Sequence, residues 1–172
     1  MESPALSLTE WVVLGLVAEG PAHGFALSRL TTATGPIGAI WHVPRPLVYR
    51  ALARLADLGL AEPSGREPGQ GGPQRNPLAI TPAGRAAVDG WLMRPVGHIR
   101  EIRTELLVKL ALLDRAGVSP HPLLDAQAER LQPIVANLRD RRDQARGFDH
   151  TVASWRYENA TAALRLMEIA RR

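Results

Sequence analysis

The chain has 172 residues, of which 45% are hydrophobic and 22% are charged, as in an ordinary globular protein. It contains no cysteine, which excludes disulfide bonds, a thiol nucleophile and thiolate metal ligands. The formal net charge of +4 permits binding to nucleic acid but does not require it.

The first predicted helix covers residues 6–19. Ser7 and Glu10 have the spacing of a capping box, and Leu6 and Trp11 fit the hydrophobic staple around it. Little polar surface follows the first turn, so we expect this helix to be buried on more than one side. Its apolar run is too short to span a bilayer and no basic run precedes it, so we expect a cytoplasmic protein with no membrane span.

A second, short helix is predicted over residues 23–32. Phe25, Ala26 and Leu30 are expected to face inward. His23 has no second histidine or carboxylate three or four positions away, so a local hydrogen bond is favoured over a role as metal ligand. We expect neither a metal nor another cofactor.

The stretch from residue 41 to residue 60 predicts a third helix, around which the rest of the chain is arranged. Pro44 and Pro46 fit its first turn, where a missing N–H costs nothing, and Gly59 fits a left-handed cap just past its end. Apolar residues recur at three- and four-residue spacing along one face: Val48, Ala51, Leu52, Leu55 and Leu58.

The opposite face of this third helix is basic and aromatic. It carries Tyr49, Arg50, Ala53 and Asp57, with Arg45 at its start. No Asp or Glu occurs between residues 20 and 56, and the helix dipole adds positive potential at the N-terminal end. Such a helix suits an approach to phosphates and entry into a DNA major groove. The alternative is an ordinary amphipathic helix with a solvated basic face.

A β-hairpin wing is predicted after the third helix. Residues 60–64 and 78–80 read as short strands on either side of a loop rich in Gly, Pro, Gln and Arg. Arg66 and Arg75 lie on its arms and Gln70 near its tip. The alternative is a plain disordered connection, which the hairpin arrangement disfavours. The loop lacks the GK[ST] ending of a nucleotide-binding P-loop.

A fourth helix is predicted over residues 81–93. Thr81 fits its N-cap and Pro82 its first position. The residues expected to face inward are Ala86, Ala87, Trp91 and Leu92. Three helices, a hairpin and a further helix make a winged helix-turn-helix, so the predicted fold is mainly α with a short β-hairpin wing.

Three segments resemble the N-terminal domain of the phenolic-acid-decarboxylase-regulator (PadR) family of bacterial transcription factors: LSLTEWVVLGLVAEGPAHGFAL, LVYRALARLADLGLAE and LAITPAGRAAVDGWL. The resemblance covers about residues 6–93. The resemblance implies a DNA-binding homodimer. It also implies repression that responds to a small-molecule ligand. Tyr49 matches the tyrosine of the family's recognition helix.

The chain departs from the family pattern at the start of the third helix and in the wing. Family members commonly have small polar residues where Pro44 and Pro46 stand, and a tyrosine where Leu78 stands. Pro77 also removes a donor from the strand ladder. These departures affect the details of the wing and of the base contacts rather than the fold.

We predict two domains, a winged helix-turn-helix over residues 1–94 and an α-helical dimerisation domain over residues 95–172. The C-terminal helices have more apolar surface than so small a detached domain can hide, which suggests a subunit interface. The predicted interface residues are Trp11, Leu106, Leu110, Leu131, Leu138, Trp155 and Leu166.

Together these features predict a homodimeric, sequence-specific transcriptional regulator, a repressor by preference, that binds a palindromic operator in double-stranded DNA. The predicted DNA contacts are Arg45, Tyr49, Arg50, Arg54, Arg66, Gln70 and Arg75. The sequence shows no paired catalytic carboxylates, nucleophile elbow or metal cluster, so we do not expect an enzyme.

Two alternatives concern small molecules and protein partners. Trp11, Trp91 and Trp155 could line an apolar cavity for a small aromatic or hydrophobic effector, although ordinary core packing is favoured for each ring. A further alternative is a winged helix that binds proteins or ligands without specific DNA binding. This alternative stays open because residues 1–95 hold eight Arg against seven Asp and Glu, a net charge of only +1.

Overall fold

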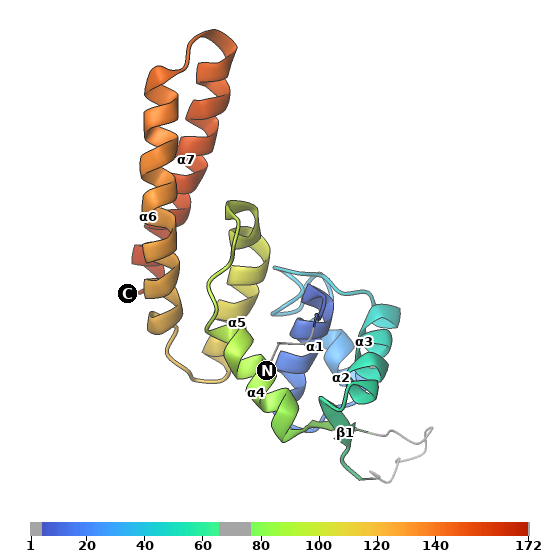
Figure 1. Ribbon diagram of the computed structural model, residues 1–172. Helices are drawn as coiled ribbons and strands as arrows, with labels where there is room; N and C mark the ends of the chain where they lie inside the picture. Colours follow the sequence, from blue (N-terminus) through green and yellow to red (C-terminus); the bar gives the residue numbers. More distant parts are fainter. Residues whose placement is uncertain (1–4, 66–76, 172) are drawn as a thin grey trace. The chain divides into compact units, whose positions relative to one another are not determined.

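A computed structural model describes residues 5–65 and 77–171 (Figure 1). The chain is mostly helical with one two-stranded antiparallel hairpin, which confirms the predicted fold class. It forms two compact units, one of residues 1–92 and 107–117 and the other of residues 93–106 and 118–172. Within the described ranges, no helix has the length and apolar character that a bilayer crossing demands.

Helix α1 (Leu8–Val17) is the centre of the first unit, and Figure 1 shows it between α3 and the pair α4 and α5. The capping box is present: the Ser7 hydroxyl accepts from the Glu10 backbone N–H at 3.3 Å, and the Glu10 carboxylate accepts from the Ser7 N–H at 2.6 Å. Every residue from Trp11 to Val17 is buried, as predicted for a helix covered on several sides.

Helix α2 (Gly24–Leu30) is shorter than predicted and uses a different inward face. Its buried residues are Gly24, Leu27 and Ser28. The prediction for Phe25 was wrong, because its side chain is 43% exposed. A helix of two turns has only one buried row, and here Leu27 occupies that row in place of Phe25.

Helix α3 (Arg45–Asp57) follows the sequence pattern closely. Val48, Ala51, Leu52 and Leu55 are buried, as predicted. Leu58, the last residue of the apolar stripe, is the C-cap residue and is exposed, so the buried part of the stripe ends at Leu55. Gly59 follows with φ at +67°, the left-handed conformation that ends helices and that glycine adopts without strain.

Strands β1 (Ala61–Pro63) and β2 (Leu78–Ile80) form the predicted hairpin, with Ala61 opposite Ile80 and Pro63 opposite Leu78. The other edge of β2 bonds to Ala22, whose N–H donates to the Leu78 carbonyl at 3.0 Å. The Pro77 carbonyl accepts from the Ser64 N–H at 3.0 Å, but the proline ring cannot return the bond. The base of the wing is therefore held on both sides, with one donor missing toward its tip.

Helix α4 (Pro82–Leu92) begins at the predicted cap, since the Thr81 hydroxyl accepts from the Gly84 N–H at 3.1 Å. Its buried row consists of Gly84, Val88, Trp91 and Leu92. The prediction of Ala86 as an inward residue was wrong, because Ala86 is exposed and Val88 fills the core instead. On the outside of α4, Arg85 donates to the Ala18 carbonyl at 2.6 Å and so caps the C-terminal end of α1.

Helix α5 (Leu107–Arg115) completes the first unit. Leu112 packs so closely on α1 that a Cβ added at Gly15 would lie 2.6 Å from its Cδ1 atom. Arg115 makes two hydrogen bonds to the Glu19 carboxylate, at 2.7 and 2.5 Å, and this bonding raises the pKa of the Arg115 guanidinium. The boundary at residue 94 stays a prediction for functional domains, while the packing assigns residues 107–117 to the first unit.

The second unit contains short helical turns η1 (Ile99–Glu101) and η2 (Ile102–Leu106) and two long helices, α6 (His121–Gln144) and α7 (Gly147–Ala170). Figure 1 shows α6 and α7 side by side as a helical hairpin, and an ion pair between Asp125 and Arg171 joins them at its open end. The buried Gln127 side chain accepts from the Val96 N–H at 2.7 Å, which fixes the connecting segment to α6.

Candidate nucleic-acid interface

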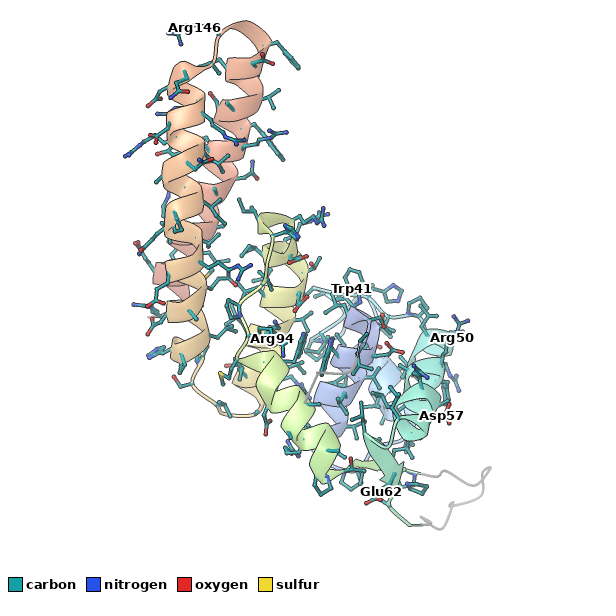
Figure 2. All side chains as sticks on the ribbon, viewed as in Figure 1. Trp41, Arg50, Asp57, Glu62, Arg94 and Arg146 are labelled. Carbon is teal, nitrogen blue, oxygen red and sulfur yellow. The ribbon has the colours of Figure 1, made fainter. Side chains whose placement is uncertain are left out.

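The exposed face of α3 carries all four side chains that the sequence predicts for this helix as DNA contacts. Arg45, Tyr49, Arg50 and Arg54 are exposed, while the opposite face is packed into the first unit. Figure 2 shows Arg50 extending from the outer side of α3. Arg50 and Arg54 are four positions apart and share one row of the helix, and Arg45 and Tyr49 share the neighbouring row.

Arg45 is held by two aromatic rings. Its guanidinium carbon lies 5.4 Å from the centre of the Phe25 ring and 5.6 Å from the centre of the Tyr49 ring, both within the range of a cation–π contact. The His23 ring lies against Phe25 with its centre 6.3 Å away. The N-terminal ends of α2 and α3 therefore form one exposed aromatic and basic cluster, consisting of His23, Phe25, Arg45 and Tyr49.

Tyr49 is seated by a close approach to α2. A Cβ added at Gly24 would lie 2.7 Å from Cε1 of the Tyr49 ring, so only glycine leaves the ring in its present position. The sequence analysis did not assign Gly24 or Phe25 to the site. In the sequence, Gly24 and Phe25 belong to the GPAHGF turn, which lies in a segment that resembles the family. The sequence alone does not show that this turn contacts the third helix.

The start of α3 is fixed by hydrogen bonds rather than by a side-chain cap. Pro44, the N-cap residue, offers no side-chain acceptor. Instead the Val43 N–H donates to the Thr31 carbonyl at 3.1 Å, and the buried Thr31 hydroxyl reaches the Val43 carbonyl at 3.3 Å. The Trp41 indole N–H donates to the Thr9 hydroxyl at 3.4 Å. Helix α3 thus starts from a position set by both α1 and α2.

The site is electropositive over a long stretch of chain. Residues 20–56 contain four arginines and no Asp or Glu. Within residues 5–65 and 77–171, none of the three exposed arginines Arg45, Arg50 and Arg54 forms an ion pair. The helix dipole adds to their positive potential at the N-terminal end of α3. An anionic ligand therefore meets three unneutralised cations on one exposed helix face.

The side chain of His23 caps the N-terminal end of α2. Its Nδ1 atom accepts from the Ala26 N–H at 3.1 Å, so the ring caps α2, as the sequence analysis favoured. Within residues 5–65 and 77–171 no group of three or more His, Asp or Glu side chains could hold a metal ion.

The remaining predicted DNA contacts are on the wing. Arg66, Gln70 and Arg75 lie outside the residues that the structure describes. The described base of the hairpin follows α3 closely, because only three residues separate Asp57 from the start of β1. Their contacts with DNA stay a prediction.

The predicted interface residues fall into two groups by exposure. Trp11, Leu106 and Leu131 are buried within the single chain, with at most 6% of each side chain exposed. Leu110, Leu138 and Leu166 are half-buried, and Trp155 is 67% exposed. All seven stay predictions for a dimer interface, and the exposed and half-buried ones have surface left to give to a partner.

Two of the three tryptophans proposed for an effector site pack against each other. The Trp11 and Trp91 rings are stacked, with centres 5.1 Å apart and planes 2° from parallel. The ammonium of Lys109, a residue only 1% exposed, lies 4.8 Å from the centre of the Trp91 ring. These contacts fill the space between the rings, so the core-packing alternative describes both side chains. An effector at these residues stays a prediction.

The chain is similar to several solved structures. Bacillus subtilis PadR in complex with operator DNA shares 15% identity with the chain, at a TM-score of 0.48 over 95% of this chain and 97% of that chain. The same protein with p-coumaric acid shares 16% identity, at a TM-score of 0.45 over 94% and 95%. The virulence activator AphA of Vibrio cholerae shares 21% identity, at a TM-score of 0.39 over 95% and 94%. No curated protein matches the sequence.

The family assignment rests on the sequence of the first unit. Residues 13–89 match the model of the transcriptional regulator PadR-like family. The matched range runs from α1 to α4 and so contains the α3 face, the aromatic and basic cluster and the wing. This match, over residues 13–89, confirms the resemblance to the PadR-like family that the sequence shows.

Proposed function

We propose that this chain is a homodimeric repressor that binds a palindromic operator, with α3 in the major groove and the wing on the flanking phosphates. The observation that carries the proposal is the exposed face of α3, where Arg45, Arg50 and Arg54 have no acidic neighbour in residues 20–56. A helix of about 10–12 Å diameter with such a face fits a major groove about 12 Å wide.

The contacts of each side chain suggest different roles. Arg45 and Tyr49 are held by the start of α2, the helix that crosses the DNA backbone in helix-turn-helix proteins, so we assign them to phosphates. Arg50 lies on the next row and makes no ion pair among the described residues, so its guanidinium can turn toward a base edge. Arginine binds the O6 and N7 atoms of guanine with two parallel hydrogen bonds.

Dimerisation follows from the geometry of operator recognition. A single recognition helix reads too few base pairs to select one site, and a two-fold dimer doubles the number. The exposed Trp155 and the half-buried leucines on α6 and α7 supply apolar surface for this purpose. Light scattering of the full chain should therefore report about twice the monomer mass of 18.7 kDa at micromolar concentration. A strict monomer would contradict the two-half-site part of the proposal.

Selection of bound sequences from a random DNA pool, at one stated salt concentration, tests the proposal as a whole. We expect an enriched palindrome whose half-sites are centred about 34–36 Å apart or a multiple of that spacing, because two α3 helices must reach the same side of the duplex. Recovery of no enriched sequence would refute specific DNA binding and would support the alternative of a protein-interaction module. A transcription assay with the selected site then tests repression, which predicts less transcript when the protein is added.

A further inference from the structure

The ring of Phe25 is an exposed apolar group within the aromatic and basic cluster. Phe25 is 43% exposed, whereas Leu27 and Ser28 of the same short helix are buried. In the described part of the first unit, Phe25 and Tyr49 are the two exposed side chains of the types Phe, Tyr and Trp. The phenolic oxygen of Tyr49 suits a phosphate, but the Phe25 ring has no polar atom and therefore needs a different ligand.

The Phe25 ring is held in place by its neighbours. The guanidinium carbon of Arg45 lies 5.4 Å from the centre of the ring, and the centre of the His23 ring lies 6.3 Å away with the two planes 25° apart. The His23 ring is fixed in turn, because its Nδ1 atom accepts from the Ala26 N–H at 3.1 Å. An apolar group that is ordered before binding can distinguish ligands by shape, and it loses little conformational freedom when a ligand binds.

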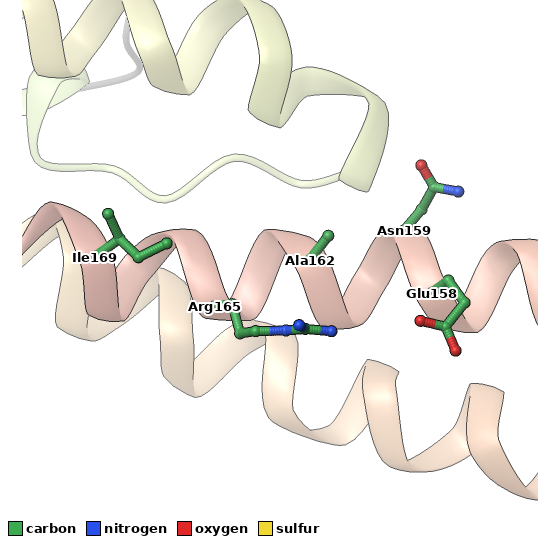
Figure 3. Close-up of a pocket in the computed structure, with 5 residues that line it drawn as sticks. All are labelled: Glu158, Asn159, Ala162, Arg165 and Ile169. Carbon is green, nitrogen blue, oxygen red and sulfur yellow. The ribbon is translucent and has the colours of Figure 1, made fainter.

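The cluster is built from two helices, unlike the surface of α7 drawn in Figure 3. The residues that line that surface are Glu158, Asn159, Ala162, Arg165 and Ile169. All five come from a single helix, so they do not enclose a ligand by themselves. The cluster instead brings Phe25 of α2 against Arg45, and Arg45 against Tyr49 of the same helix α3. Because residues 20–56 contain no Asp or Glu, the charge of this surface suits a polyanion with an apolar group at its edge.

Double-stranded DNA offers one apolar group of this kind in its major groove, the C5-methyl group of thymine. That methyl group projects at the edge of the groove, close to the backbone of its own strand. The proposed function assigns Arg45 and Tyr49 to phosphates, and the guanidinium of Arg45 lies on the Phe25 ring. A ring that neighbours a phosphate-binding arginine at the start of the recognition helix is therefore within reach of such a methyl group.

We propose that Phe25 contacts the C5-methyl group of one thymine in each half-site of the operator, so that α2 adds base specificity to that of α3. This inference rests on the DNA binding of the proposed function and names a base that the protein selects. Cytosine is disfavoured at the same position, because its N4 amino group would meet an apolar ring and lose a hydrogen-bond partner. The same ring holds Arg45 beside the neighbouring phosphate.

Replacement of single thymines by deoxyuridine tests the contact, because the two bases pair alike and differ only by the C5-methyl group. Each thymine of the selected operator would be replaced in both half-sites at once, and the affinity of the full-length protein would be measured by fluorescence anisotropy at fixed salt. At one thymine the wild-type protein should lose affinity about fifteenfold, since one buried methyl group in each half-site contributes a factor of about four.

Variants of the ring complete a double-mutant cycle. Phe25→Ala should bind the thymine and uracil operators within about twofold of each other at that position and keep the wild-type uracil effects elsewhere. This ratio isolates the methyl contact, because loss of the support for Arg45 weakens binding to both operators equally. Phe25→Leu keeps an apolar side chain and should give an intermediate ratio. Leu58→Ala, which shortens an exposed apolar side chain at the other end of α3, is the matched control and should keep the full ratio.

These experiments separate the inference from the function on which it rests. Equal uracil effects in the wild-type and Phe25→Ala proteins at every thymine would overturn the methyl contact and leave the DNA-binding regulator standing. A selected half-site that contains no A·T pair would have the same meaning. Failure to enrich any sequence from the random DNA pool would refute both.

Discussion

At the scale of single residues, the site depends on how two side chains are seated rather than on how many charges are present. Arg45 lies on the Phe25 and Tyr49 rings, and Tyr49 occupies space that only glycine at position 24 leaves free. Ordered side chains lose less conformational freedom on binding than free ones, so this packing favours the phosphate contacts that we propose for the cluster.

The Gly24→Ala substitution tests this seating. The added methyl group would lie 2.7 Å from the Tyr49 ring and must push it aside, while alanine is a better helix former than glycine. We expect a midpoint of thermal unfolding within a few degrees of the original and operator binding weakened about tenfold, measured by fluorescence anisotropy.

The control for this substitution is a double-mutant cycle. In a Tyr49→Ala background the methyl group has no ring to displace, so Gly24→Ala should have almost no further effect on DNA binding. If Gly24→Ala weakens DNA binding equally with and without the tyrosine ring, displacement of the Tyr49 ring is not the cause of the weaker binding.

At the scale of the elements, local sequence signals predicted most of the first unit. The capping box of Ser7 and Glu10, the Thr81 cap and the left-handed Gly59 act over a few residues, so their positions can be read without knowledge of the fold. The face of a short helix is less well determined. Phe25 and Leu27 are both apolar, and only contact with α3 shows which one enters the core.

The position of α5 shows a second limit of local reasoning. In the sequence, Ile102, Leu106, Leu110 and Leu113 recur at helical spacing, but this spacing does not show which element the helix packs against. The packing of Leu112 on Gly15 and the bonding of Arg115 to Glu19 join segments nearly a hundred residues apart. Such pairing leaves no periodic pattern in the sequence. The sequence predicted the exposed basic face of α3, whereas the contacts of Phe25 and Gly24 with that face required the structure.

For the wing we predict an electrostatic role. Arg66→Ala or Arg75→Ala should weaken specific and non-specific DNA binding alike, because arginines on a Gly-rich loop suit phosphates better than fixed base edges. Each substitution should also reduce the slope of log affinity against log salt by about one phosphate contact. A changed base preference with an unaltered slope would show instead that these arginines read sequence.

The role of α5 can be tested by truncation. A chain ending at residue 94 lacks Val108, Leu112 and Leu113, all buried, and each contributes roughly 1.5–3 kcal/mol by burial. Because that sum is comparable to the stability of a small domain, we expect no cooperative thermal transition from this chain. A chain ending at residue 117 keeps α5 and should unfold cooperatively in circular dichroism. Equal transitions for both would show that α5 is not part of the first unit's core.

At the scale of the whole molecule, the proposed function assigns a different task to each of the two units. The first unit presents α3 and the base of the wing, and the second presents the exposed Trp155 on α7. Neither feature is sufficient for operator recognition, because one recognition helix gives too little specificity and a dimer without a reading helix gives none. A homodimer that uses Trp155 as apolar interface surface predicts that Trp155→Ala changes affinity for a full palindrome far more than affinity for a single half-site.

Base-by-base titration of the selected operator tests the claim that α3 reads base sequence through Arg50. Wild-type protein, Arg50→Ala and the control Arg141→Ala on α6 would each be titrated at fixed salt against operators carrying every base at each half-site position. We predict that Arg50→Ala leaves the thermal midpoint unchanged and loses about 1–3 kcal/mol of discrimination at one guanine in each half-site, with the other positions and the control unaffected. An Arg50→Ala variant with wild-type affinity and wild-type preference at every position would contradict the claim.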